Sequence, residues 1–159
     1  MYSFFGLSVG VVILAMLAAW GDQINYEKGN GTTNRVRLEA SAIAQSVEAS
    51  HAAAVAWYRD NSTHTGLIVA DLSDYLPYGF TQAYAVETRV ESGFVVTRFN
   101  EALPSFVTTT MVAAELYGRS ESPYAGLATN TGVENAGGSF PVTHTIPVGS
   151  IMIGDLVND

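Results

Sequence analysis

The feature of this sequence that most constrains its fold is an apolar run at its N-terminal end. Residues 2–20 read YSFFGLSVGVVILAMLAAW, and every charged side chain of the protein comes after them. A helix of this length spans about 28 Å at 1.5 Å per residue, which matches the roughly 30 Å hydrocarbon core of a bilayer. Residues 1–20 are therefore predicted to form a transmembrane anchor.

A cleaved secretory signal peptide is the alternative interpretation of this run. Signal peptides begin with a basic region and have a shorter apolar core, whereas residues 1–6 contain no Lys or Arg. Ala15, Ala18 and Ala19 offer a weak cleavage site. The sequence favours a retained anchor and leaves cleavage open.

The rest of the chain divides into a linker and one small domain. Residues 21–34 are polar, and Gly29-Asn30-Gly31 is expected to break any helix that leaves the membrane. Residues 35–159 suffice for one modest hydrophobic core. The absence of cysteine excludes disulfides, thiol nucleophiles and cysteine-based zinc sites.

Charge limits the possible partners. The formal net charge is −8, with only 7 Lys and Arg residues. Binding to nucleic acid or to anionic lipid needs clustered basic side chains, and none are present, so neither is predicted. Near the apolar run, Lys28, Arg35 and Arg37 lie on its C-terminal side, which weakly favours a cytoplasmic domain by the positive-inside rule.

The main helix of the domain is expected from Val36 to about Tyr58, with Thr33 or Asn34 as its N-cap. Its apolar residues recur every three or four positions, so one face can pack on the rest of the domain. The residues on this face are Val36, Ala40, Ile43, Val47, Ala54 and Tyr58. We therefore predict an amphipathic packing helix.

Short apolar or alternating runs after this helix predict strands. Residues 66–70 form a short buried run, and 84–90 and 94–99 alternate in polarity about a Gly-containing turn, which predicts a β-hairpin. Residues 71–80 are expected to form one helical turn. Residues 146–153 read as a turn that leads into a last strand.

A second packing helix is expected over residues 106–117, with Ser105 as N-cap and Gly118 as terminator. Its predicted buried face holds Val107, Met111 and Ala114. Residues 118–138 are rich in Ser, Asn and Gly, and predict a long surface loop around one short strand near 126–129. The whole pattern predicts an α+β domain, pilin-like, with an antiparallel sheet covered on one face.

The sequence contains no recognisable catalytic, cofactor or metal motif. His51, His64 and His144 are far apart, and His51 is expected to be a solvated or capping group. Asp60 and His64 flank a predicted turn, and two ligands alone do not make a metal site. We therefore predict no enzymatic activity, no metal and no cofactor.

Three further motifs have simpler interpretations. Residues 29–33 resemble a phosphate-binding loop but lack its lysine and glycine spacing. Asn30 and Asn61 begin glycosylation tripeptides of a kind common by chance. Asp71 and Asp74 are expected to cap a short helix rather than act as paired carboxylates.

The aromatic cluster Tyr75, Tyr78, Phe80 and Tyr84 is the candidate partner-binding patch. Large aromatic side chains are most often buried, so a core seam against the main helix is the favoured interpretation. An exposed docking patch is the alternative, and exposed apolar area would support it.

The order of these segments resembles the PilM-type inner-membrane accessory proteins of type IVb pili, the thin pili of conjugative plasmids. The matching segments follow the N-terminal apolar run and are Ala56-Trp57-Tyr58, Tyr75-Leu76-Pro77-Tyr78-Gly79-Phe80, Leu103-Pro104, Leu116-Tyr117, Asn130-Thr131-Gly132-Val133 and Ile146-Pro147-Val148-Gly149-Ser150-Ile151. The resemblance covers nearly the whole chain, but each motif is short. It implies a periplasmic domain that scaffolds basal-body proteins or pilin.

A minor pilin or pseudopilin is the closest alternative, and a membrane-tethered hydrolase is the least favoured. Pilins have a basic leader and a glutamate at mature position five, whereas this chain has no basic leader and has Phe5 at that position. Their first helix also runs unbroken into the head domain, which the glycines at 29 and 31 argue against here. The hydrolase would need a convergent polar site.

Overall fold

The computed structural model of the protein describes residues 3–142 and 146–157, with side chains from residue 31 onward. Contacts divide the chain into two compact units, Met1–Arg37 and Leu38–Asp159. Within the part whose side chains are described, no helix is long and apolar enough to cross a membrane. The side chains of the predicted anchor, residues 1–20, lie outside that part.

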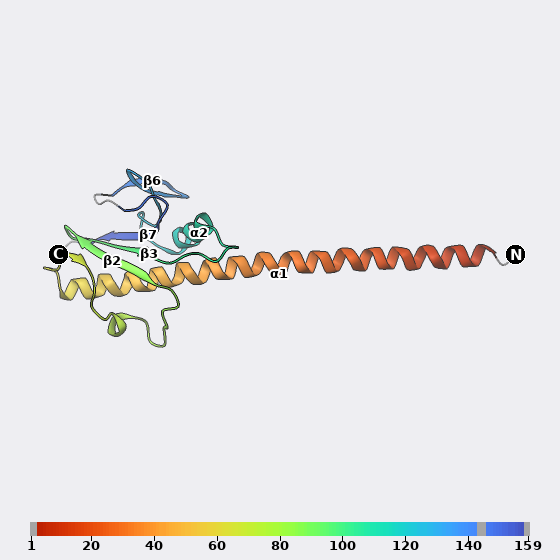
Figure 1. Cartoon of the computed structure of the whole chain (residues 1–159), viewed down its shortest axis with the longest axis horizontal. Coiled ribbons are helices and arrows are strands. Elements are labelled where there is room, and N and C mark those ends of the chain that lie inside the picture. Colours follow the sequence, from red (N-terminus) through yellow and green to blue (C-terminus); the bar gives the residue numbers. More distant parts are fainter. Residues whose placement is uncertain (1–2, 143–145, 158–159) are drawn as a thin grey trace. The chain divides into compact units, whose positions relative to one another are not determined.

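The first element, α1, is a single helix from Ser3 to Asp60 (Figure 1). The predicted helix break at Gly29-Asn30-Gly31 and the predicted N-cap at Thr33 or Asn34 are therefore wrong. Each glycine in a helix interior costs only about 1 kcal/mol relative to Ala. Residues 21–34 contain no proline, and continuing a helix is easier than starting a new one.

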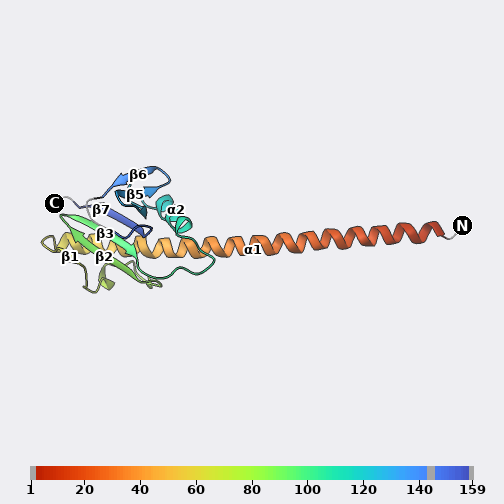
Figure 2. The same ribbon diagram turned by 45° about the horizontal axis from the view of Figure 1, so that its top comes forward.

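The second unit is, as predicted, an α+β domain with an antiparallel sheet, and this sheet has seven strands (Figure 2). The spatial order of the strands is β1-β2-β3-β7-β4-β5-β6, so the last strand of the chain lies at the centre. The bounds are β1 Gly66–Leu67, β2 Val86–Glu91, β3 Phe94–Phe99, β4 Gly126–Ala128, β5 Gly132–Asn135, β6 Gly138–Pro141 and β7 Ile151–Leu156.

The hairpin of β2 and β3 and the last strand confirm the sequence prediction. The hairpin turn is Ser92-Gly93, and both residues have positive φ, 52° and 78°, as two-residue type I′ turns require. The predicted buried strand 66–70 is wrong in length and burial, because β1 has two residues and its Leu67 is exposed. A strand at the edge of a sheet has only one neighbour to bury it.

The region 118–138, predicted to be mostly surface loop, contributes β4 and β5 and the start of β6. The helix α2 runs from Thr109 to Arg119 and is capped by Thr108, whose side chain accepts a hydrogen bond from the Met111 N–H. The predicted cap at Ser105 and terminator at Gly118 are therefore wrong. The later start also changes the buried face, which consists of Val112, Ala113 and Leu116, while the predicted Met111 and Ala114 are exposed.

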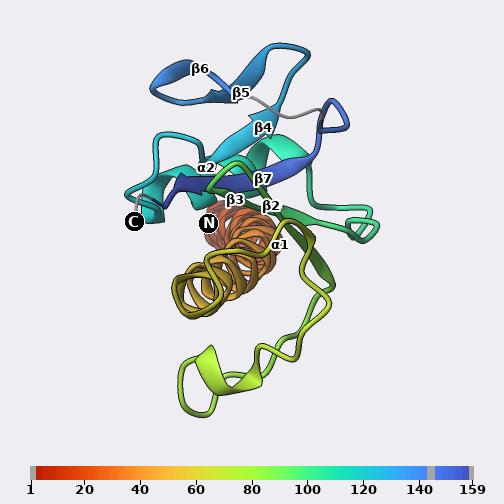
Figure 3. The same ribbon diagram turned by 90° about the vertical axis from the view of Figure 1, so that its left-hand side faces the viewer.

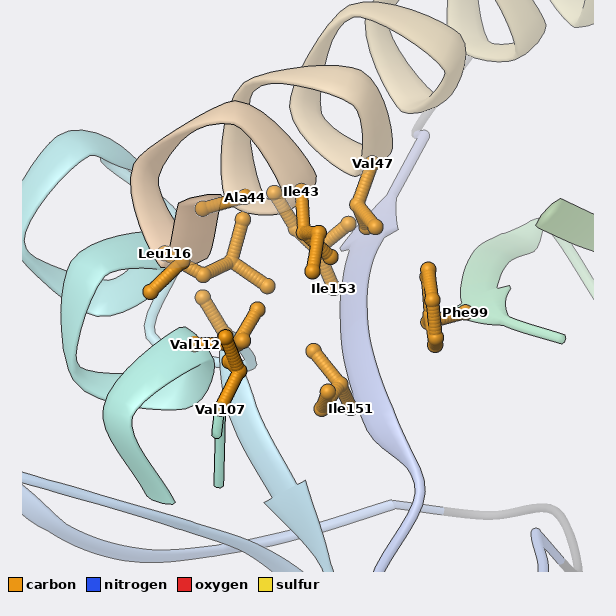
Figure 4. Packing of buried hydrophobic residues seen from close by; sticks show 11 residues of the cluster. Ile43, Ala44, Val47, Phe99, Val107, Val112, Leu116, Ile151 and Ile153 are labelled. Carbon is orange, nitrogen blue, oxygen red and sulfur yellow. The ribbon is translucent and has the colours of Figure 1, made fainter. Parts of the chain in front are cut away.

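The main hydrophobic core lies where α1 and α2 meet β3 and β7 (Figures 3 and 4). From the predicted face of α1, Ala40, Ile43, Val47, Ala54 and Tyr58 are buried. This confirms an amphipathic helix packed on an antiparallel sheet. The opposite face of the sheet is also partly covered, because a second cluster joins residues of β3 and β7 to Ala128 of β4 and Val133 of β5.

Candidate functional site

The four residues of the predicted aromatic patch differ in burial. Tyr84 is half-buried against the main core, with its ring 6.0 Å from that of Phe99, and its hydroxyl donates to the Glu39 carboxylate. Tyr78 is fully exposed, and Tyr75 and Phe80 are intermediate. The core-seam interpretation therefore holds for Tyr84 and is wrong for Tyr78.

The segment that carries these residues runs from β1 to β2 and lies beyond α1 on the side away from β5 and β6 (Figures 1 and 3). Its only helical element is the 3-10 helix η1, Ser73–Tyr75. The Tyr75 hydroxyl donates to Asp60 at 3.0 Å and ties this segment to the end of α1. Among the ring contacts of the described residues, none joins two of the four predicted aromatics.

Asp71 and Asp74 do not form a carboxylate pair in this segment. The Asp71 carboxylate accepts the Ser73 N–H at 2.9 Å, which satisfies a backbone donor at the start of η1. That hydrogen bond also lowers the pKa of Asp71 below its usual value. Leu72 is the N-cap residue of η1 and makes no side-chain capping bond, so Asp71 forms an Asx-type turn before η1 rather than the predicted cap.

A buried polar side chain of the domain is His51, which the sequence prediction placed in solvent or at a helix cap. That prediction is wrong, because His51 is only 3% exposed and points from α1 toward the sheet. Its Nδ1 lies 3.1 Å from the Thr97 hydroxyl on β3, and its Nε2 lies 3.3 Å from the Asp155 carboxylate on β7. A polar chain thus connects α1 to two central strands.

The chain continues into β2, because the Thr97 and Thr88 hydroxyls lie 2.9 Å apart. With a proton on Nε2 the imidazole donates to Asp155, and its Nδ1 bonds to the Thr97 hydroxyl. An acid, an imidazole and a hydroxyl in this order also occur in hydrolases. Here the hydroxyl has no access to a substrate, because Thr97 is 0% exposed, so the geometry supports a structural role.

A pocket of about 310 Å³ opens beside the acidic end of this chain. It lies between α1, the Ser120–Ser122 segment and β7, and Glu48, Arg59 and Glu121 contribute charges to its wall. Burial raises the pKa of Asp155, but the hydrogen bond and charge of His51, with Ser122 and Arg59, outweigh burial and hold it below its usual value. Asp155 is therefore a carboxylate at neutral pH.

His64 does not join this site. His64 packs edge-on against Trp57, with ring centroids 5.0 Å apart, and its Nε2 donates to the Leu67 carbonyl at 3.2 Å. His144 lies outside the described residues. No three His, Cys, Asp or Glu side chains in the described part of the chain come together as a metal site.

Two remaining motifs can also be placed. Residues 29–33, the phosphate-loop look-alike, lie within α1 rather than in a loop. Asn61 is exposed just after α1, and its amide donates to the Trp57 carbonyl at 2.9 Å. Neither segment forms a binding loop.

The position of His51 could have been foreseen from helical spacing. It lies four residues after Val47 and three before Ala54, so it shares their buried face. What the sequence alone does not show is that Thr97 and Asp155 lie opposite it.

Comparisons with known proteins add no family or structural relative. No protein-family model, no curated protein and no solved structure matches the chain.

Proposed function

We propose that this protein is a non-enzymatic component of a type IVb pilus assembly or basal-body apparatus. In this proposal residues 1–20 anchor it in a bacterial inner membrane, and its α+β domain lies in the periplasm, where it scaffolds other assembly proteins or pilin. The observation that carries the proposal is α1, a single element from Ser3 to Asp60. It contains both the uncharged apolar run and the helix face on which the domain core is built.

The other support is the resemblance to PilM-type accessory proteins. The resembling motifs are distributed over the domain, and four of them contribute buried residues: Tyr58 on α1, Leu116 on α2, Val133 on β5 and Ile151 on β7. The closed His51 chain also favours a scaffold, because its hydroxyl is not open to solutes. A scaffold needs a stable fold and an accessible binding surface, and it does not need a reactive side chain.

A second candidate function is that of a minor pilin or pseudopilin-like filament subunit. The unbroken α1 favours it, because the expected helix break at residues 29–31 had been an argument against it. The apolar run argues the other way, since residues 1–21 contain Phe5 and no acidic side chain. In pilins, the glutamate of the first helix pairs with a positive charge in the apolar filament core. A chain that lacks this glutamate cannot form that ion pair.

Shearing of cells separates the two candidates. Pili sheared from cells and the remaining membranes are compared by immunoblot, with the major pilin and an inner-membrane protein as fraction markers and a deletion strain to test assembly. We expect the protein in the inner-membrane fraction and loss of pili on deletion. Recovery along purified filaments at pilin-like abundance would support the minor pilin instead, and normal pili in the deletion strain would refute both.

Protease treatment of spheroplasts tests the topology. The segment from Val69 to Ala83 is largely exposed and provides cleavage sites if the domain is periplasmic. We expect cleavage in intact spheroplasts, with a cytoplasmic protein protected in the same sample. Cleavage only after the inner membrane is broken would place the domain in the cytoplasm, as the charges of Lys28, Arg35 and Arg37 suggest.

A further inference from the structure

The sheet has an incompletely paired edge at the start of β2. The register of β1 with β2 pairs Gly66 with Val90 and Leu67 with Arg89, and one more bond follows, from the Ile68 N–H to the Thr88 carbonyl at 2.9 Å. The chain then leaves the sheet at Val69, which is 84% exposed. The first half of β2 therefore has a partner on its β3 side only.

The alternation of backbone direction shows which groups are open. The Thr88 carbonyl faces β1, and the Ala85 carbonyl faces the other side, where it accepts the Asn100 N–H. The N–H and carbonyl of Val86 thus point to the same side as those of Thr88. No described residue hydrogen-bonds to the Val86 backbone on that side or to the Thr88 N–H. Such a row is a template for another strand.

A groove follows this open edge. It has a volume of about 250 Å³ and lies between α1, the segment after β1, and β2, with Ser50, Leu76, Val86 and Thr88 in its wall. Because side chains of a strand alternate, every second residue of an added strand would point toward this groove. The site thus offers both main-chain bonds and a place for side chains.

The charges around the edge are acidic. Residues 60–88 contain no Lys or Arg. Asp71 lines the groove on the open side of β2. Glu101 accepts the Ala85 N–H at 2.7 Å and so lies on the β3 side, away from the open edge. The nearby arginines, Arg89 on β2 and Arg98 on β3, already pair with Glu91 and Glu87, at 3.6 Å and 2.9 Å. The charge complement of this edge is a basic segment.

We propose that the open end of β2 binds an extended, basic peptide segment of a partner protein by strand addition. The partner strand continues the line of β1, bonds to the Val86 backbone and the Thr88 N–H, and places Lys or Arg near Asp71. Main-chain bonds supply most of the affinity, and the charges supply selectivity. The inference does not depend on the pilus assignment.

The test uses the full chain in mild detergent and two labelled synthetic peptides. In both peptides Val and Thr alternate, with flanking lysines in one and flanking glutamates in the other. Fluorescence anisotropy is expected to show that the lysine peptide binds at least about tenfold more tightly than the glutamate peptide at low salt. Binding of the lysine peptide should weaken as the salt concentration is raised, because salt screens the charges. Hydrogen exchange is expected to slow at Val86 and Thr88 on binding.

Val86→Pro removes the open N–H while leaving the β3 side of β2 intact, and is expected to weaken binding of the lysine peptide by about tenfold or more. The matched control is Ser139→Pro on β6, the other edge strand. Pro141 is paired with β5 but has no N–H to donate, so its backbone nitrogen faces away from β5. Ser139 lies two residues earlier, so its N–H faces the same way and is not needed for pairing. The control is expected to bind the peptide like the unaltered protein.

A charge variant keeps the test decisive if Val86→Pro does not fold. Asp71→Asn retains the acceptor for the Ser73 N–H and is expected to abolish the preference for the lysine peptide. Equal binding of both peptides to the unaltered protein, or binding without slowed exchange at Val86 and Thr88, would overturn the proposal. Protection of those amides by raising the protein concentration alone would also overturn it and make a second copy the occupant.

Discussion

Two segments of the domain are organised against what their compositions suggest. Residues 69–85 are rich in aromatic and apolar side chains, yet they form a largely exposed segment with one 3-10 turn. Residues 120–141 are rich in Gly, Ser and Asn, yet they form β4, β5 and β6 and part of the second cluster. In this domain, close approach of neighbouring backbones decides which segment joins the sheet more than hydrophobicity does.

Glycines allow the close approach in the second segment. A Cβ on Gly126 would overlap the Glu134 carbonyl, and a Cβ on Gly132 would overlap the Phe140 carbonyl. In the aromatic segment, Gly79 has a φ of 75° and open space around it. The glycines of β4 and β5 are packing positions, whereas Gly79 serves a turn.

The largest predicted effect is therefore at Gly132. Gly132→Ala should lower the free energy of unfolding by about 3 kcal/mol or more, because backbone atoms of β6 would have to move. Urea unfolding of the full chain in mild detergent measures it. A change below about 1 kcal/mol would mean that β5 and β6 are not held this closely.

Gly118→Ala is the matched control. Gly118 lies in α2 with no atom near its missing Cβ, so alanine should stabilise the protein by up to about 1 kcal/mol through helix propensity. If both substitutions destabilised equally, backbone proximity would not be the reason.

The second effect concerns two histidines: His51, buried between α1 and the sheet, and His64, which follows α1. His51→Ala removes the bonds to Thr97 and Asp155 and leaves a cavity, which should cost about 2–3 kcal/mol. His64→Ala should cost about 0.5 kcal/mol, since its contacts lie at the surface. Similar losses from both would remove the distinction between the two sites.

The contact between His51 and Asp155 makes the stability of the protein depend on pH. The pKa of Asp155 is lower in the folded protein than in the unfolded chain, so the carboxylate stabilises the fold above its ordinary pKa near 4. That contribution is lost as pH falls through the lowered value. Below pH 4, the stability of His51→Ala should therefore fall less steeply than that of the unaltered protein.

Much of the fold could be predicted from periodicity. The buried face of α1 from Ala40 to Tyr58, the β2–β3 hairpin and the last strand all follow from local spacing, which acts within one element. The helix break at residues 29–31 could not be predicted correctly, because two glycines lower helix stability without deciding where a helix ends.

The site was harder to predict, because it depends on which strands become neighbours. His51 meets Thr97 and Asp155 only because β7 inserts beside β3, and those residues lie 46 and 104 positions away in sequence. The strands β5 and β6 were missed for a similar reason. Their glycines read locally as turn residues, and their packing role needs the partner strand.

Tyr84 is expected to show the third effect, because it is the aromatic residue that fixes the exposed segment to the core. Tyr84→Phe keeps the contact with Phe99 and removes the hydroxyl bond to Glu39, at a cost of about 1 kcal/mol. That bond raises the pKa of Tyr84 to about 12, above the usual 10. The stabilisation should be complete below pH 10 and disappear as pH approaches 12, so the two proteins should converge there.

Tyr78 is expected to show the smallest effect and gives the most direct test of the comparison. Its side chain is 109% exposed and has no described ring partner, so Tyr78→Ala should change the free energy of unfolding by less than about 0.5 kcal/mol. A loss above about 1.5 kcal/mol would mean that the ring is buried in solution and that the aromatic segment does close on α1 as a core seam. If Tyr78→Ala leaves the free energy of unfolding nearly unchanged while Gly132→Ala lowers it strongly, the close backbone approach at Gly132 contributes more to stability than the exposed Tyr78 side chain does.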